Sequence, residues 1–309
     1  MEPTSDLATA AGDSAETREE PALAPAAPGT ASERDLSVVE IRGGRGGLSR
    51  ATLRELYDFR EVLWAFVLRT VKVKYKQATV GIGWAVLQPL LSAAVFSLVL
   101  GHFAKVPRDG ISAPVFFLCG MVPWTYFSGA TGTAMESVIR DAALVRKIYF
   151  PREILPISAV LAALVDLVPG VVVLAIVATL YGYTPGIEWI AMPLPILLLV
   201  TTALAAGLLP SALNVFYRDV RLALPFFLQV GLFASAVIYP LSQISQPWRT
   251  VWGIANPVVT AIDSVRRIVA HGTWPQPGML AGALAWSLIL VVASYWGFKR
   301  MERSFADRV

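Results

Sequence analysis

Residues 154–182 read ILPISAVLAALVDLVPGVVVLAIVATLYG and contain a single charged side chain, that of Asp166. A helix of about 20 apolar residues is enough to cross the hydrocarbon core of a bilayer, which is about 30 Å thick. This stretch is longer, and the proline near its centre, Pro169, is tolerated in a membrane because neighbouring helices satisfy the freed carbonyl group. The segment therefore predicts a membrane-spanning helix.

Five further apolar segments repeat this pattern along the chain, at residues 82–104, 113–135, 189–213, 222–241 and 279–298. Across the 309 residues, 55% are hydrophobic and 16% are charged, whereas a soluble domain usually carries about 25% charged residues. One soluble core could not bury this much apolar surface. The sequence therefore predicts an all-α membrane protein with six transmembrane helices per protomer.

The lysines and arginines near the ends of these segments predict the orientation of the chain. Fourteen lie before the first span, in the loops after the second and fourth spans, or after the sixth span, and five lie on the other side. Basic residues concentrate on the cytoplasmic side of membrane proteins. We therefore expect a multi-pass protein of the inner (plasma) membrane with both termini in the cytoplasm.

The residues before the first span divide into two regions. Residues 1–36 are rich in Ala, Pro, Ser and Glu and lack an apolar run, so we expect a disordered cytoplasmic tail. Residues 37–81 contain an amphipathic helix that is too polar to span, followed by a basic linker. We expect this helix to lie at the membrane interface, before a transmembrane domain at 82–309; a helix packed on its own domain is the alternative.

The loop between the last two spans, residues 242–278, is long and apolar for an external loop. It carries Trp248, Trp252 and Trp274, and Asn256-Pro257 interrupts any helix within it. We expect two short re-entrant helices that dip into the outer leaflet before the last span.

Several classes of function lack their motifs in this sequence. There is no G-x-x-x-x-G-K-[ST] phosphate loop, no H-E-x-x-H and no G-x-S-x-G. The single Cys119 excludes an internal disulfide, and two histidines far apart in the sequence argue against a metal centre. We therefore expect a chain that is not an enzyme, with no cofactor, no metal and no nucleic-acid partner.

Three sequence runs carry a resemblance to a known family. They are the K-Y-K-Q…W-A…Q-P run at 74–89, KIYFPREILP at 147–156 and NVFYRDV at 214–220. In this order they resemble the permease subunit of ABC-2 type exporters for O-antigen, capsule and teichoic acid polysaccharides, over about residues 50–300. The resemblance implies a homodimer that works with two copies of a separate ABC ATPase, which binds ATP and Mg²⁺. It also implies membrane lipids as surroundings and a polysaccharide linked to polyprenyl diphosphate as substrate.

The resemblance further implies that the loop between spans two and three is a coupling helix docked on the ATPase. A proline, two aromatic rings and a rim of charges suit such a contact. The alternative is a basic loop that only fixes topology. The predicted coupling residues are Arg146, Lys147, Tyr149, Phe150, Pro151, Arg152 and Glu153.

Two further groups of residues are candidates for contact with the substrate. Basic side chains before span one could bind the diphosphate, although topology and lipid headgroups also explain them; they are Arg69, Lys72, Lys74 and Lys76. Aromatic side chains in span two could stack on sugar rings in a channel, although an interfacial aromatic belt is the alternative; they are Trp124, Tyr126 and Phe127.

Asp166 lies roughly in the middle of its span. A charge at that depth costs about 2.5–3.5 kcal/mol on insertion scales, so the carboxylate should face a partner or water. Asp166 either lines a conduit or is protonated and hydrogen-bonded between helices.

Three other functions remain as alternatives to polysaccharide export. A membrane glycosyltransferase or acyltransferase would need a group of carboxylates or histidines on one membrane face, which the sequence does not show. A drug exporter of the same superfamily would be expected to have a shorter external loop and no KIYFPREILP-like run. A structural anchor would not need spans that are interrupted by proline.

Overall fold

The computed structural model describes residues 54, 57–76, 83–147, 150–302 and 305, and these residues form helices and loops without a strand. The predicted tail at 1–36 lies outside the described residues. The elements are, in order, α2 (Arg60–Lys76), α3 (Gly83–Phe96), η1 (Ser97–Phe103), α4 (Ala113–Arg140), α5 (Ala142–Lys147), α6 (Ile154–Leu180), η2 (Ile187–Ala191), α7 (Pro193–Phe216), α8 (Asp219–Ala234), η3 (Leu241–Gln243), α9 (Trp248–Ala255), α10 (Pro257–Arg266), η4 (Arg267–His271) and α11 (Pro277–Glu302).

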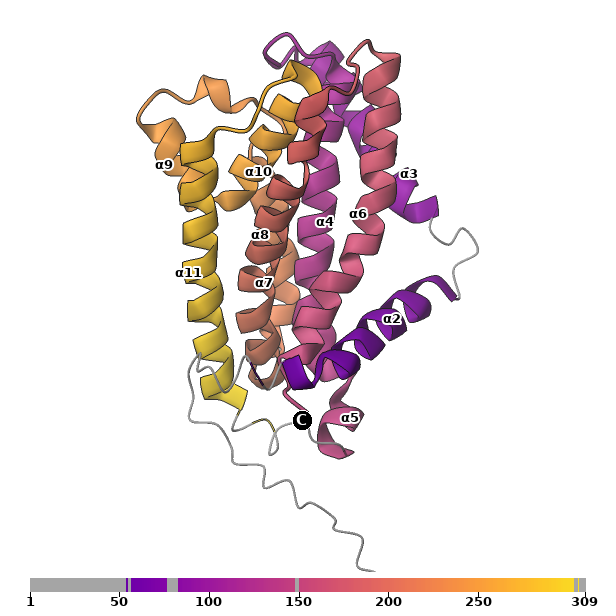
Figure 1. Ribbon diagram of the computed structural model, residues 1–309, viewed down its shortest axis with the longest axis vertical. Helices are drawn as coiled ribbons and strands as arrows, with labels where there is room; N and C mark the ends of the chain where they lie inside the picture. Colours follow the sequence, from indigo (N-terminus) through magenta and orange to yellow (C-terminus); the bar gives the residue numbers. More distant parts are fainter. Residues whose placement is uncertain (1–53, 55–56, 77–82, 148–149, 303–304, 306–309) are drawn as a thin grey trace, which may run out of the picture. The chain divides into compact units, whose positions relative to one another are not determined.

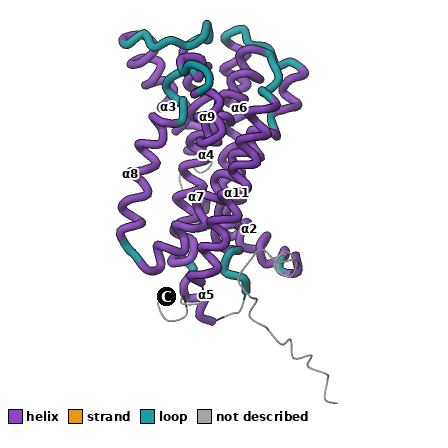
Figure 2. The backbone as a smooth tube through the Cα atoms, turned by 90° about the vertical axis from the view of Figure 1, so that its left-hand side faces the viewer, coloured by secondary structure: helices purple, strands orange, loops and turns teal. Residues whose placement is uncertain are grey.

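Within the described residues, four helical stretches are long and apolar enough to cross a membrane. They correspond to the predicted first, third, fourth and sixth spans, at Val86–Phe103, Ile154–Leu180, Ile187–Phe216 and Pro277–Glu302. The predicted second and fifth spans correspond to α4, whose 28 residues include several polar side chains, and to α8, which has 16 residues. Figures 1 and 2 show both running lengthwise in the bundle. The count of six spans remains a prediction.

Helix α4 is the central helix of the bundle and packs against α3, α6, α7, α8 and α10. It begins after Ser112 with a proline in its first turn, where the missing N–H would have no helical partner. Its contact with α7 is close, because a Cβ atom on Gly207 would lie only 2.7 Å from the Cβ of Ala134. Small residues at such crossings let helix backbones approach each other.

The two ends of the bundle carry different elements. Helices α2 and α5 and the end of α11 lie at one end, whereas α9 and the start of α11 lie toward the other (Figure 1). The predicted pair of short helices before the last span is confirmed as α9 and α10, which meet at Asn256. Their position in the outer leaflet stays a prediction.

Helix α2 packs on α6 through the face that contains Val67 (Figure 1). Its outward face mixes charged side chains, such as Lys72, with exposed apolar ones, such as Trp64 and Leu68. The sequence correctly predicts a helix in this region, whereas its amphipathic character and its location at a membrane surface remain predictions.

Candidate functional site

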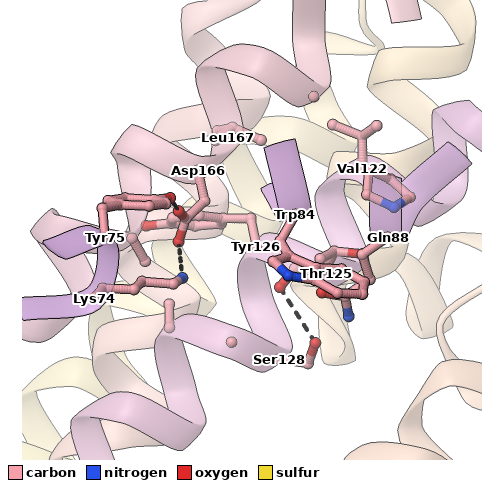
Figure 3. A pocket seen from close by; sticks show the side chains of 15 residues that line it. Lys74, Tyr75, Trp84, Gln88, Val122, Thr125, Tyr126, Ser128, Asp166 and Leu167 are labelled. Atoms are coloured by element: carbon pink, nitrogen blue, oxygen red, sulfur yellow. Dashed lines mark hydrogen bonds and ion pairs between the residues drawn. The ribbon is translucent and has the colours of Figure 1, made fainter. Parts of the chain in front are cut away.

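A cavity of about 210 Å³ lies between α2, α3, α4 and α6 (Figure 3). Its wall combines the end of α2 with the middle of α4 and α6. The polar and aromatic side chains that line it are Lys74, Tyr75, Trp84, Gln88, Thr125, Tyr126, Ser128 and Asp166. The cavity therefore brings together residues from the predicted basic group, the predicted aromatic group and the intramembrane acid.

Asp166 is bound at this cavity by two side chains of α2 (Figure 3). The Lys74 ammonium group lies 2.5 Å from one carboxylate oxygen, and the Tyr75 hydroxyl donates a hydrogen bond to the other. The Asp166 side chain is 20% exposed. We expect this carboxylate to face a partner or water, and in the structure it meets two partners on α2 at the edge of the cavity.

A second ion pair fastens α2 near its middle. Arg69 lies 2.6 Å from Asp141, which follows α4 and is 5% exposed. Two of the four predicted phosphate-binding residues, Arg69 and Lys74, are thus paired with carboxylates of the same chain. Lys72 and Lys76 are exposed and form no ion pair among the described residues. The structure therefore divides the predicted basic group into two paired and two unpaired cations.

The predicted coupling loop, residues 146–153, is partly buried within the chain itself. The Phe150 side chain is 6% exposed and packs on Phe66 of α2, with ring centroids 5.4 Å apart. Pro151 is also buried, whereas Lys147 is exposed. Tyr149 and the side chain of Arg146 lie outside the described residues. The expectation that Phe150 is a free anchor for a partner needs correction, because its ring is already covered by α2.

Glu153 connects the coupling loop to α11. Its carboxylate is fully buried, accepts a hydrogen bond of 2.9 Å from the Tyr295 hydroxyl and lies 2.7 Å from the Lys299 ammonium group. Lys299 also pairs with Glu302 at 2.8 Å. Arg152 adds a hydrogen bond of 2.9 Å from Nη1 to the backbone oxygen of Glu302. Glu153 therefore faces the last turns of α11 and presents no surface for a partner protein.

The three predicted channel aromatics are also buried within the chain. Trp124, Tyr126 and Phe127 are 5%, 3% and 9% exposed. Trp124 lies against α8, because a Cβ atom on Gly231 would be 3.0 Å from its ring. Tyr126 borders the cavity and donates to the backbone oxygen of Val160. In this conformation Trp124 and Phe127 are core residues, so they do not line an open conduit.

Several residues of the site were not singled out from the sequence. They are Tyr75, Asp141, Tyr295, Lys299 and Glu302. Two of them could have been found from the sequence. Asp141 is an acid near the predicted end of a span, and Tyr75 is the aromatic neighbour of Lys74. An acid beside a membrane should find a cation. Lys299 is one of the fourteen basic residues that predict the orientation of the chain.

Comparison with known proteins identifies the group to which this arrangement belongs. Residues 61–269 match the ABC-2 type transporter family. The chain belongs to this family. As an ABC-2 type transporter it carries both the cavity and the coupling loop inside the matched residues, whereas α11, with Lys299, lies beyond them.

Named relatives of this ABC-2 type transporter are similar over most of their length. The chain is 29% identical over 259 residues to the O-antigen export system permease protein RfbA of Myxococcus xanthus, covering 83% of this chain and 98% of that protein. It is 26% identical to a protein of the same name from Klebsiella pneumoniae, covering 80% and 94%. It is 24% identical to the polysialic acid transport protein KpsM of Escherichia coli, covering 67% and 81%.

Proposed function

We propose that the chain is the transmembrane channel subunit of an ATP-driven exporter, which moves a polysaccharide linked to polyprenyl diphosphate from the cytoplasm across the inner membrane. Membership of the ABC-2 type family and the near full-length match to a relative named as an O-antigen export permease support this proposal. In the proposed complex ATP and Mg²⁺ bind to a separate ATPase. The chain itself performs no chemical conversion.

The observation that carries the proposal is that the coupling loop contacts two helices, α2 and α11. Phe150 contacts α2, and Glu153 contacts α11. A push on this loop by the partner ATPase would therefore act on both helices. The loop's exposed Lys147, with Arg146, Tyr149 and the partly exposed Arg152, would contact the ATPase directly. Pro151, Phe150 and Glu153 would transmit the movement from inside.

We further propose that two copies of the chain form the exporter, with six spans each and both termini in the cytoplasm. Helix α8 supports association, because none of its residues is buried in the single chain. Its exposed apolar side chains include Leu222, Phe226, Phe227, Val230 and Phe233. A second copy could cover part of this face and lipid the remainder. The conduit would then lie between the copies.

Export is tested by following the polymer in cells from which the chain has been removed. In the proposal such cells retain full-length polymer inside, and returning the chain restores polymer at the surface. Loss of Lys72 and Lys76 by paired substitution to Gln should reduce surface polymer at least severalfold, because these unpaired cations would meet the diphosphate. The matched control replaces Arg54 and Arg60, two exposed cations toward the other end of the same region, with Gln.

The same experiment separates the proposal from its rivals. Shortened or incomplete polymer would indicate a glycosyltransferase or acyltransferase. Normal surface polymer in cells without the chain would indicate the transport of another compound, such as a drug. If the double substitution of Lys72 and Lys76 and its control reduce export equally, these two lysines do not bind the substrate.

A further inference from the structure

A second cavity, of about 430 Å³, lies at the end of the bundle where α4 begins. Helix α4 has 28 residues, so this end is about 42 Å from the coupling loop that follows the other end of α4. The wall is built from three segments that are distant in the sequence. They are Asp109–Phe116 before and in α4, Pro240–Arg249 around η3 and α9, and Asp263–Gln276 in α10, η4 and the loop that follows.

The charged side chains of this wall are mostly cationic. Three arginines, Arg249, Arg266 and Arg267, share the wall with two aspartates, Asp109 and Asp263. His271 is also part of the wall. Asp263 is paired with Arg267 at 2.7 Å, and Asp109 accepts a hydrogen bond of 2.7 Å from the Ser242 hydroxyl. Among the described residues, no carboxylate lies within ion-pair distance of Arg249 or Arg266. The cavity therefore has an excess of positive charge.

Arg266 is the most deeply buried cation of the cavity, with 3% of its surface exposed. Its guanidinium group donates to the backbone oxygens of Tyr239 at 3.1 Å and Val237 at 2.7 Å, and it lies 3.8 Å from the centre of the Phe116 ring. Its Nε atom is buried and has no hydrogen-bond partner in the described part of the chain. Burial lowers the pKa of Arg266 to about 10, so the group is still protonated at neutral pH.

A buried charge is unfavourable unless an opposite charge compensates it. Asp263 and Asp109 act on the charge of Arg266 from a distance, but neither lies within ion-pair distance of it. The backbone oxygens around Arg266 supply only partial charges. An anion in the adjoining cavity would supply a full one. The arrangement of Arg266 therefore favours occupation of the cavity by an anion.

The other two arginines are held in place and still have donors to offer. Arg249 uses Nε and Nη2 to bind the backbone oxygens of Ile244 and Ser242, at 3.0 and 2.6 Å. Arg267 uses Nε to bind Asp263. A guanidinium group has five N–H donors. Each of these arginines thus keeps N–H groups that make no hydrogen bond among the described residues, and its orientation is fixed before a ligand arrives.

We propose that this cavity binds a phosphate group. The planar fork of arginine matches the oxygens of phosphate, and hydrogen bonds between two charged groups are the stronger ones in proteins. The volume exceeds that of one phosphate, so the group can be part of a larger molecule. That molecule is a phospholipid headgroup or a soluble phosphate compound, and the shared chemistry is the phosphate. The site goes beyond the proposed function, because it requires neither the ATPase nor a direction of transport.

Binding is measured on the purified full-length chain in detergent, with inorganic phosphate as the probe in calorimetric titration. Arg249→Gln should weaken binding about tenfold or more, because a charged hydrogen bond contributes roughly 1.5–3 kcal/mol. Asp109→Asn should tighten binding a few-fold, because it removes a negative charge from the wall. A variant that gains affinity cannot be explained by damage to the fold. Lys105→Gln, an exposed cation outside the wall, is the matched control and should stay within about twofold.

The source of the phosphate is identified in nanodiscs of phosphatidylglycerol or phosphatidylcholine, by native mass spectrometry of the lipid retained. Retention of phosphatidylglycerol that depends on Arg249 indicates a lipid headgroup, whereas binding of inorganic phosphate alone indicates a soluble compound. Affinities that are equal in the wild type, Arg249→Gln and Asp109→Asn would overturn the proposal. If Arg249→Gln fails to fold, the response of Asp109→Asn decides alone. Loss of polymer export with intact phosphate binding would count against the proposed function and leave this site standing.

Discussion

Replacing Glu153 with Gln should destabilise the protein and uncouple the loop from α11. The Glu153 carboxylate is fully buried, and the Lys299 side chain that faces it is 18% exposed. Removing one member of a buried ion pair costs about 3–5 kcal/mol, since the other charge is left without a partner. Here the cost is smaller, because Lys299 keeps Glu302 at 2.8 Å and the Gln oxygen can still accept from Tyr295. We expect a loss of about 2–3 kcal/mol.

The assay is thermal unfolding of the purified chain in detergent. A loss of 2–3 kcal/mol corresponds to a fall in Tm of about 4–6 °C for a chain of this size. The matched control is Glu136→Gln, because Glu136 also pairs with a cation, Arg221 at 3.2 Å, but the two side chains are 46% and 70% exposed. Exposed pairs contribute about 0–1 kcal/mol, so this control should lower the Tm by less than about 2 °C.

A functional measurement separates stability from coupling. In the proposed exporter, Glu153→Gln should reduce ATP-driven polymer export well below that of the Glu136→Gln control at a temperature where both variants remain folded. Retention of the ATPase on the purified chain should change little, because Glu153 presents no surface to a partner. If Glu153→Gln has the same Tm and the same polymer export as Glu136→Gln, the contact between the loop and α11 contributes neither to stability nor to coupling, and the argument fails.

Two further substitutions test the packing of α4. Gly207→Ala should cost about 1–3 kcal/mol, because the added methyl group would lie 2.7 Å from a methyl group of α4, whereas Gly132→Ala, with open space around it, should be neutral or stabilising in the same melting assay. Trp124→Ala should cost about 3–5 kcal/mol by leaving a cavity between α4 and α8; unchanged melting with reduced export would instead return Trp124 to a channel wall.

The spans that could be predicted from the sequence are those that consist almost entirely of apolar residues. The stretch that contains Asp166 has no other charge, and α6 covers almost the whole predicted range. The break at Asn256 was also predictable, because proline prevents helix continuation locally. Helix α4 is a different case. Its polar and aromatic residues are accommodated because other helices surround it, and that environment is a tertiary property.

The partners at the site could not be predicted in the same way. Lys74 and Asp166 are 92 positions apart, and Glu153 and Lys299 are 146 apart. These pairs exist because α2 lies along α6 and because α11 ends beside the coupling loop, which no local pattern encodes. Trp124 shows the same limit, since an aromatic residue in a span suits a channel, an interfacial belt or a core. In the single chain its burial and its contact with α8 favour the core.

The contacts of α2 connect the coupling loop to the first cavity. Phe66 touches Phe150 of the loop, and Lys74 binds Asp166 at the cavity. Lys74 follows Phe66 by eight positions of continuous helix, which is a rise of about 12 Å. A helix of this length transmits displacement as a rigid body, so a shift of the loop must either carry Asp166 and α6 along or break the pair with Lys74. In the proposed exporter, breaking it would free Lys74 beside the Asp166 carboxylate, and Lys74 could then join Lys72 and Lys76 in attracting the diphosphate of the substrate. In the proposed exporter, the ion pair would therefore link a movement of the loop to the side chains that line the first cavity.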